Sequence, residues 1–128
     1  MSTNAHGQHI FLDYNRFFPE DHQDGNWVLN ILKEVVERST ATEVHAHVEL
    51  FDGITSPPGF AAVVLLDESH LTAHCYSELG WLAIDAFTCG GTDPSGMVID
   101  LKAVLELEIP DLVLMQEQKV NRFLHLED

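Results

Sequence analysis

Three side chains of different chemistry stand at short, fixed distances along one stretch of this sequence. Ser69 offers a hydroxyl, His74 an imidazole five residues later, and Cys89 a thiol twenty residues after Ser69. Groups of these types serve as nucleophiles and as proton donors or acceptors in catalysis. Taken singly, each also has an ordinary explanation, because Ser69 follows Glu68 in a predicted turn and free cysteines are often small buried apolar residues. Their combination is what makes this stretch a candidate site.

Hydrophobic periodicity predicts the elements that hold these residues. An amphipathic helix of about 14 residues is expected after the capping residue Asp24, and a second helix is expected over 97–107, capped by Asp93 or Ser95 and ended by Pro110. Apolar runs and period-two alternation predict strands at 9–14, 43–51, 60–66, 70–76, 81–88 and 112–115.

This order of elements predicts a single α+β domain over residues 1–128. Several strands in succession favour a mainly antiparallel sheet, and two helices with one apolar face each would cover one side of it. We therefore expect a two-layer sandwich in which both helices pack on the same face of the sheet.

Composition narrows the class of partner. The chain has 128 residues, with 21 acidic and 6 basic side chains and a formal net charge of −15. Nucleic acids and anionic membranes are poor partners for such a surface, whereas a cationic small molecule suits it. Two cysteines, a polar N-terminal segment and the lack of long apolar stretches predict a soluble cytoplasmic protein with free thiols.

Two segments of the sequence resemble the small prokaryotic S-adenosylmethionine decarboxylases. That family carries a Glu-Ser-His-x-x-x-His segment and, downstream, an Asp-x-[Phe/Tyr]-Thr-Cys-Gly segment. The matching stretches here are Glu68-Ser-His-Leu-Thr-Ala-His74 and Ala83-Ile-Asp-Ala-Phe-Thr-Cys-Gly90. The resemblance extends over most of the chain, since Gly7-x-His9 fits the start of the family pattern and Thr92-Asp-Pro94 fits its end.

The resemblance implies a zymogen that cuts itself between Glu68 and Ser69, into pieces of 68 and 60 residues. Ser69 would become a pyruvoyl group, with His74 assisting the elimination step. The pyruvoyl group would form a Schiff base with the substrate amine, and Cys89 would return a proton to the substrate carbon after carbon dioxide leaves. The product would be the aminopropyl donor for spermidine and other polyamines.

The family also implies how the substrate and a second subunit are bound. The family segment after the second histidine is often Thr-Trp-Pro-Glu, and here Tyr76 keeps an aromatic face and Glu78 keeps the carboxylate. Both suit a sulfonium cation. We further expect a homodimer of cleaved protomers, because one face of the sheet is left uncovered and the family buries it by dimerisation.

Two departures from the family pattern concern processing and substrate. The family commonly has a Ser-Gly pair eight residues before the pyruvoyl serine, whereas this chain has Ala61-Ala62, so that Thr55 or Ser56 would have to supply the hydroxyl. The preceding loop also lacks the usual aromatic residue, although Phe51 and Phe60 are close in sequence.

Three alternatives therefore stay open. The first is a pyruvoyl-dependent ornithine or arginine decarboxylase of the same superfamily, and the second is an unprocessed non-catalytic homologue. A metal-binding module would instead use His45, His47 and Glu49, which share one strand face. Because no established zinc-ligand spacing is present, we expect no metal.

Overall fold

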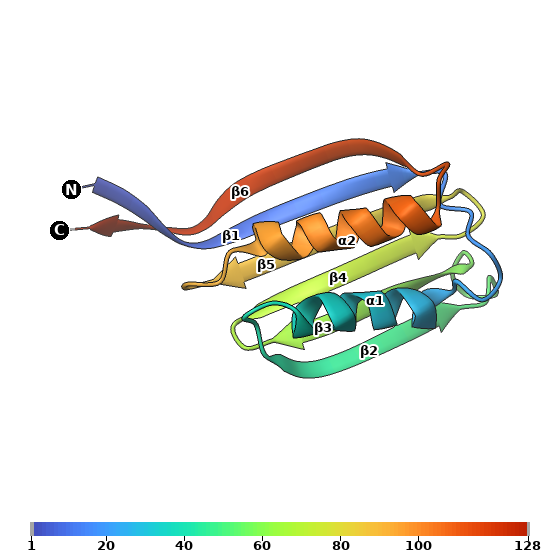
Figure 1. Cartoon of the computed structure of the whole chain (residues 1–128), viewed down its shortest axis with the longest axis horizontal. Helices are drawn as coiled ribbons and strands as arrows, with labels where there is room; N and C mark the ends of the chain where they lie inside the picture. Colours follow the sequence, from blue (N-terminus) through green and yellow to red (C-terminus); the bar gives the residue numbers. More distant parts are fainter. Residues whose placement is uncertain (1, 128) are drawn as a thin grey trace.

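The computed structural model describes residues 2–127, which form one antiparallel sheet and two helices (Figure 1). The elements in chain order are β1 (Ser2–Asn15), α1 (Gly25–Glu37), β2 (Glu43–Phe51), β3 (Gly59–Leu66), β4 (Ser69–Tyr76), β5 (Trp81–Cys89), α2 (Pro94–Glu108) and β6 (Val113–Glu127). The sheet order is β2-β3-β4-β5-β1-β6. The expected α+β class and order of elements are confirmed.

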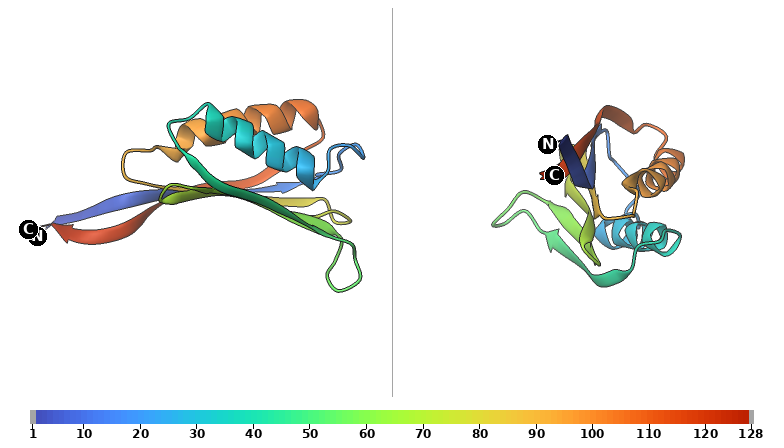
Figure 2. Two further views of the ribbon diagram at one scale, coloured as in Figure 1. Left: turned by 90° about the horizontal axis from the view of Figure 1, so that it is seen from below. Right: turned by 90° about the vertical axis from the view of Figure 1, so that its left-hand side faces the viewer.

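Both helices lie on one face of the sheet, and the opposite face is bare (Figure 2, left). The core between the layers consists of apolar side chains that alternate along the strands and recur along the helices. Fully buried examples are Leu12, Val28, Leu32, Leu71, Ile84 and Leu101. The predicted two-layer sandwich is therefore confirmed.

Side-chain caps fix where both helices begin. The Asp24 carboxylate accepts a hydrogen bond from the backbone N–H of Trp27 at 3.1 Å, and Asp93 accepts one from Ser95 at 2.9 Å. Asp93, rather than Ser95, is thus the cap of α2. That helix ends at Glu108, shortly before Pro110, which disfavours a helical residue ahead of it. Neither helix is long and apolar enough, within residues 2–127, to cross a membrane.

The edge strand β2 is less buried than its sequence pattern predicts. Ala46 and Val48 are half-buried, but Val44 and Leu50, at either end of the same face, are 60% and 54% exposed. The reason is its place in the sheet, since β2 pairs only with β3 and has no strand on its outer side.

The outer strands β1 and β6 are longer than predicted. They pair with each other from Ser2–Glu127 to Asn15–Val113, and beyond the rest of the sheet they continue as a two-stranded ribbon that carries both termini (Figure 1). The β1 segment is polar, and the β6 segment carries apolar residues such as Leu124 and Leu126 that are exposed, so that the pairing of the two distant segments defines the ribbon.

Candidate active site

The bond between Glu68 and Ser69 lies in the tight turn that joins β3 to β4. Leu66 pairs with Ser69 across this hairpin, which leaves Asp67 and Glu68 to make the turn. Glu68 has a φ of 64°, a left-handed conformation that is unfavourable for a residue with a Cβ. The backbone is therefore strained next to the bond that family resemblance marks for cleavage.

Ser69 and Cys89 meet at this turn although they are twenty residues apart. The backbone N–H of Cys89 donates a hydrogen bond of 3.1 Å to Ser69 Oγ. Ser69 is 6% and Cys89 9% exposed, so that both sit away from bulk water. The antiparallel pairing of β4 with β5 creates this proximity, because it places the start of β4 beside the end of β5.

The surroundings of Cys89 keep its thiol protonated. Burial, and then the negative charge of Glu68, raise the pKa of Cys89 above its ordinary value. An unperturbed thiol has a pKa of about 8.5, so a raised value leaves the proton on sulfur at neutral pH. Cys89 is therefore equipped to give a proton to a carbon atom held at Ser69.

His74 is not part of this cluster within one chain. It lies five residues further along β4, a distance of about 17 Å at the usual rise per residue. The residues of β4 alternate in burial, and Ser69 belongs to the helix-covered set whereas His74 belongs to the bare face. One protomer therefore does not bring Ser69 and His74 together.

His74 and Tyr76 form a second cluster on the bare face, between two cavities. The larger cavity, of about 480 Å³, also has Trp81 in its wall, and the ring centroids of Tyr76 and Trp81 are 5.9 Å apart. This wall is mainly apolar, and it includes Leu82, Ala83 and Met115.

The smaller cavity, of about 350 Å³, contains the positions at which this chain departs from the family pattern. Ser56, Ala61 and His74 all line it, and Ala61 is the cross-strand partner of His74. Thr55 does not line it. Phe51 and Phe60 also line it, but the Phe60 ring is buried on the helix-covered face against Phe17, so that Phe51 is the aromatic residue on the side of His74.

Glu78 is placed by the structure in the exposed turn between β4 and β5. It lines neither of the two cavities beside His74 and Tyr76.

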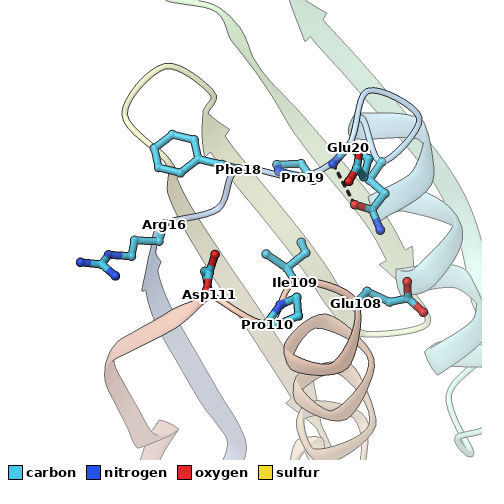
Figure 3. Close-up of a pocket in the computed structure, with 9 residues that line it drawn as sticks. Arg16, Phe18, Pro19, Glu20, Glu108, Ile109, Pro110 and Asp111 are labelled. Carbon is cyan, nitrogen blue, oxygen red and sulfur yellow. Dashed lines mark hydrogen bonds between the residues drawn. The ribbon is translucent and has the colours of Figure 1, made fainter.

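A third cavity, of about 440 Å³, holds none of the residues expected in the site. It lies where the loop after β1 meets the end of α2, and Figure 3 shows Arg16, Glu20, Glu108 and Asp111 around it. Its rim carries charges of both signs.

An aromatic and histidine cluster around Phe87 was missed by the sequence analysis. On the bare face, the Phe87 ring is 5.4 Å from the ring of His70 and 6.3 Å from that of His9. His9 Nε2 pairs with Asp85 Oδ1 at 2.8 Å. Burial, and then the neighbouring His9, lower the pKa of His70, which keeps its imidazole neutral at pH 7. The alternation along β5 was the available signal, because it puts Asp85, Phe87 and Cys89 on one face.

The histidines of β2 do not make a metal centre. His47 Nε2 pairs with Glu49 Oε1 at 2.9 Å, and both side chains are largely exposed. Among residues 2–127, no three His, Cys, Asp or Glu side chains are grouped so as to hold a metal ion. The metal-binding alternative is not supported by these residues.

The fold is an α+β sandwich with one bare sheet face, and a hydroxyl and a thiol lie together at a strained hairpin. Comparison with known sequences identifies the class of proteins that has these features. The sequence pattern of the S-adenosylmethionine decarboxylase family matches residues 8–116. This chain belongs to that family.

Known proteins agree with this assignment. The S-adenosylmethionine decarboxylase proenzyme of Thermodesulfovibrio yellowstonii is 33% identical over 113 residues, covering 88% of this chain and 81% of the relative. The proenzyme of the same name from Symbiobacterium thermophilum is 36% identical over 106 residues, covering 82% and 77%. The crystal structure of the adenosylmethionine decarboxylase from Aquifex aeolicus shares the fold, with a TM-score of 0.64 at 22% identity over 95% of this chain and 90% of that one.

Proposed function

We propose that this chain is a proenzyme that cuts itself between Glu68 and Ser69 and then decarboxylates S-adenosylmethionine, supplying the aminopropyl donor for polyamine synthesis. Membership of the decarboxylase family supports the reaction type. The observation that carries the proposal is the strained turn at Glu68, directly beside a buried Ser69 hydroxyl that is bonded to the backbone of Cys89.

Self-cleavage begins when Ser69 Oγ attacks the carbonyl carbon of Glu68. The peptide C–N bond breaks, its nitrogen gains a proton, and an ester links the two pieces. Removal of the Ser69 α-proton then breaks the Cβ–Oγ bond, which leaves a carboxylate on Glu68 and a dehydroalanine at position 69. Addition of water and release of ammonia convert this residue to a pyruvoyl group. Strain at Glu68 lowers the barrier, because it is relieved when the bond breaks.

The position of Ser69 fits a pyruvoyl group, which is no larger than the serine it replaces. The Cys89 N–H that now donates to Ser69 Oγ can donate to a carbonyl oxygen at the same place. A pyruvoyl group supplies an electron-accepting carbonyl for the decarboxylation of an amino acid. Burial excludes water from this place, and the protonated Cys89 thiol gives its proton to the substrate carbon that has lost its carboxylate.

A complete site requires a second copy of the chain. His74 and Tyr76 lie on the bare face, about 17 Å along β4 from Ser69. Cys89, whose backbone is bonded to Ser69, belongs to the same bare face at the sheet end. A partner's bare face laid against this one would therefore bring its His74 and Tyr76 to the end of the sheet that holds Ser69 and Cys89. The bare face includes apolar side chains such as Val63 and Leu65, which such packing would bury. We therefore propose a homodimer of cleaved protomers, in which the partner subunit's His74 assists the elimination at Ser69.

The cavity beside Tyr76 favours S-adenosylmethionine over ornithine or arginine. Tyr76 and Trp81 offer flat aromatic surfaces in a mainly apolar wall, which suit an adenine ring and a sulfonium group better than a flexible aliphatic amine. The family resemblance assigns Glu78, two residues beyond Tyr76, to the cationic part of the substrate, although within one chain Glu78 lines neither cavity beside Tyr76. The net charge of −15 attracts cationic substrates. Both cysteines are free, which agrees with a reducing compartment such as the cytoplasm.

Mass spectrometry of the denatured protein tests the proposal. We expect two fragments split between Glu68 and Ser69, the C-terminal one blocked at its amino end, and carbon dioxide release from S-adenosylmethionine but not from ornithine or arginine. The Ser69→Ala protein should stay intact and release none. A wild-type chain that stays uncut and inactive would instead be a non-catalytic homologue. Release from ornithine or arginine alone would correct the substrate and keep the mechanism.

A further inference from the structure

Arg122 is brought to the edge of the candidate site by the strand pairing of β1. Gly7 in β1 pairs with Cys89 on one side and with Arg122 of β6 on the other. The three residues therefore form one row across the sheet, and Arg122 is two strands, or about 10 Å, from Cys89. Arg122 also lies beyond residues 8–116, which match the family pattern.

The middle position of this row is Gly7, which carries no side chain between Cys89 and Arg122. A Cβ placed there would stand 3.0 Å from Thr88 O, 3.4 Å from Phe87 Cε1 and 3.5 Å from Cys89 Sγ. This position is therefore closely bordered by the thiol and the Phe87 ring. No side chain of β1 stands in the row between the thiol and the guanidinium.

Aromatic residues contact the Arg122 side chain on this face of the sheet. The guanidinium carbon lies 5.5 Å from the centroid of the Phe87 ring. Phe123, which follows Arg122, has a φ of 52°, and its ring is 5.9 Å from that of Phe87. An unfavourable backbone conformation next to the site is thus maintained by aromatic packing.

The charge of Arg122 is not neutralised by a carboxylate. Lys33, Arg38 and Lys102 each pair with a glutamate, whereas Arg16, Lys119 and Arg122 make no ion pair with any of residues 2–127. Of these three, Arg122 is the one that lies in the row with Cys89. A guanidinium without an acidic partner, held beside a thiol, is suited to an incoming anion.

We propose that Arg122 binds the α-carboxylate of the substrate. The inference rests on the proposed function, because this carboxylate is the only anionic group of S-adenosylmethionine. A guanidinium matches a carboxylate with two parallel hydrogen bonds, and it would hold the group that leaves near the thiol that afterwards supplies the proton. Since the carboxylate departs as carbon dioxide, the product loses this contact, and Arg122 favours the substrate over the product.

Kinetics of the processed enzyme test the proposal with two variants and a matched control. Arg122→Gln removes the charge, and Arg122→Lys keeps the charge without the two-pronged geometry. Lys119→Gln, three residues earlier on β6, removes the same charge at a residue that pairs with Ile10 and donates to Ser95 Oγ. For each protein, the cleaved fraction, the KM for S-adenosylmethionine and the inhibition constant of the decarboxylated product are measured.

We expect Arg122→Gln to raise the KM about 10-fold or more, as for the loss of a charge-assisted hydrogen bond. Arg122→Lys should raise it less, and the inhibition constant of the product should stay unchanged in both. Lys119→Gln should leave all three quantities unchanged.

Other results would overturn the inference. A merely structural role would weaken substrate and product binding equally, and an unchanged KM would exclude contact with the carboxylate. Loss of cleavage in both variants would place Arg122 in processing instead. If the wild-type enzyme fails to release carbon dioxide from S-adenosylmethionine, the proposed function itself is wrong. That result is distinguishable from the outcomes above, which all concern variants of an active enzyme.

Discussion

At the scale of single residues, the hydroxyl that this family places opposite the second histidine is missing. Ala61 is the cross-strand partner of His74, and its methyl group cannot donate or accept a hydrogen bond. Ser56 lines the cavity that Ala61 and His74 share, whereas Thr55 does not. Of the two hydroxyls that the sequence offered as substitutes, the structure therefore favours Ser56.

We predict that Ser56→Ala slows self-cleavage about tenfold or more, because it removes a group that can relay a proton near His74. Ala61→Ser should speed cleavage by restoring a hydroxyl at the family position. Thr55→Ala is the matched control from the same loop. The measurement is the intact fraction against time after synthesis. Equal slowing by Thr55→Ala and Ser56→Ala would attribute the effect to the loop backbone.

Removal of the charge at Glu68 should change the pKa of the Cys89 thiol but not that of the Cys75 thiol. The pKa of Cys89 is raised by burial and then by Glu68, and burial raises the pKa of Cys75 to about 11. Only the thiolate reacts with iodoacetamide, so both should be slow at pH 7 and faster as the pH rises through their pKa values.

In the uncleaved Ser69→Ala protein, we predict that Glu68→Gln lowers the pKa of Cys89 and moves its alkylation profile to lower pH. The profile of Cys75 should not move, and peptide mapping of each thiol provides this internal control. A shift of both profiles would indicate local unfolding.

The residue types at the site could be predicted from the sequence. Which of these residues lie together could be predicted only in part. The Ser69 and Cys89 spacing is a local motif, and the hairpin and strand pairing bring the two together as expected of one site. His74 is as close in sequence, yet strand geometry carries it away. Arg122 gave no signal, because its place beside Cys89 depends on Gly7 pairing with two strands at once.

At the scale of elements, the β3–β4 hairpin has an unfavourable backbone conformation beside the proposed cleavage site, as Arg16 and Phe123 have elsewhere in the chain. Glu68 has a left-handed φ at a position where glycine would be favoured, while Asp67 does not share this conformation. The hairpin is otherwise regular, with pairs from Gly59–Tyr76 to Leu66–Ser69.

We predict that Glu68→Gly raises the free energy of unfolding of the Ser69→Ala protein by about 0.5–1 kcal/mol, since glycine adopts this φ without strain. Asp67→Gly is the control. It should lower the free energy of unfolding, because it increases the conformational entropy of the unfolded chain without relieving strain in the folded one. Urea denaturation measures both. In the chain with Ser69, Glu68→Gly should also cleave more slowly. A Glu68→Gly protein that is less stable and cleaves at the wild-type rate would remove strain from the mechanism.

Helices and strands with a hydrophobic period in their own residues could be predicted from the sequence. Strands that form only by pairing with a segment far away in the sequence could not. The helix α1 has an apolar stripe and a cap within its own residues, and its position matches the prediction. The strands β1 and β6 were predicted at 9–14 and 112–115, whereas they span Ser2–Asn15 and Val113–Glu127. The outer half of β1 is polar, and the apolar residues in the outer half of β6, such as Leu124 and Leu126, are exposed and not part of the core. The strand structure there is therefore defined by the pairing of the two segments.

At the scale of the whole molecule, one chain holds two incomplete halves of a site. Glu68, Ser69 and Cys89 gather at one end of β4, and His74 with Tyr76 lies toward its other end on the bare face. A rigid sheet cannot bend to close a gap of about 17 Å. Two copies that pack their bare faces with opposite strand directions would bring the first half of each against the second half of the other.

Mixing two inactive variants tests this arrangement, and we predict that cleavage returns in the mixture. Neither Ser69→Ala nor His74→Ala chains should cleave alone, because each lacks one required group in every site. In a mixed dimer, one site has Ser69 from the His74→Ala chain and His74 from the Ser69→Ala chain, and it is complete. Co-expression should therefore yield cleaved His74→Ala chains and intact Ser69→Ala chains, which their masses distinguish.

The double variant, with both substitutions in one chain, is the control for this mixture. Co-expressed with wild type, it forms mixed dimers whose two sites each lack one group, so that the wild-type chains in these dimers stay intact. If His74 acted within its own chain, the Ser69→Ala and His74→Ala mixture would show no cleavage at all. Because the gap along β4 is fixed by strand geometry rather than by side-chain rotation, recovery in the mixture would follow only from a site shared between two subunits.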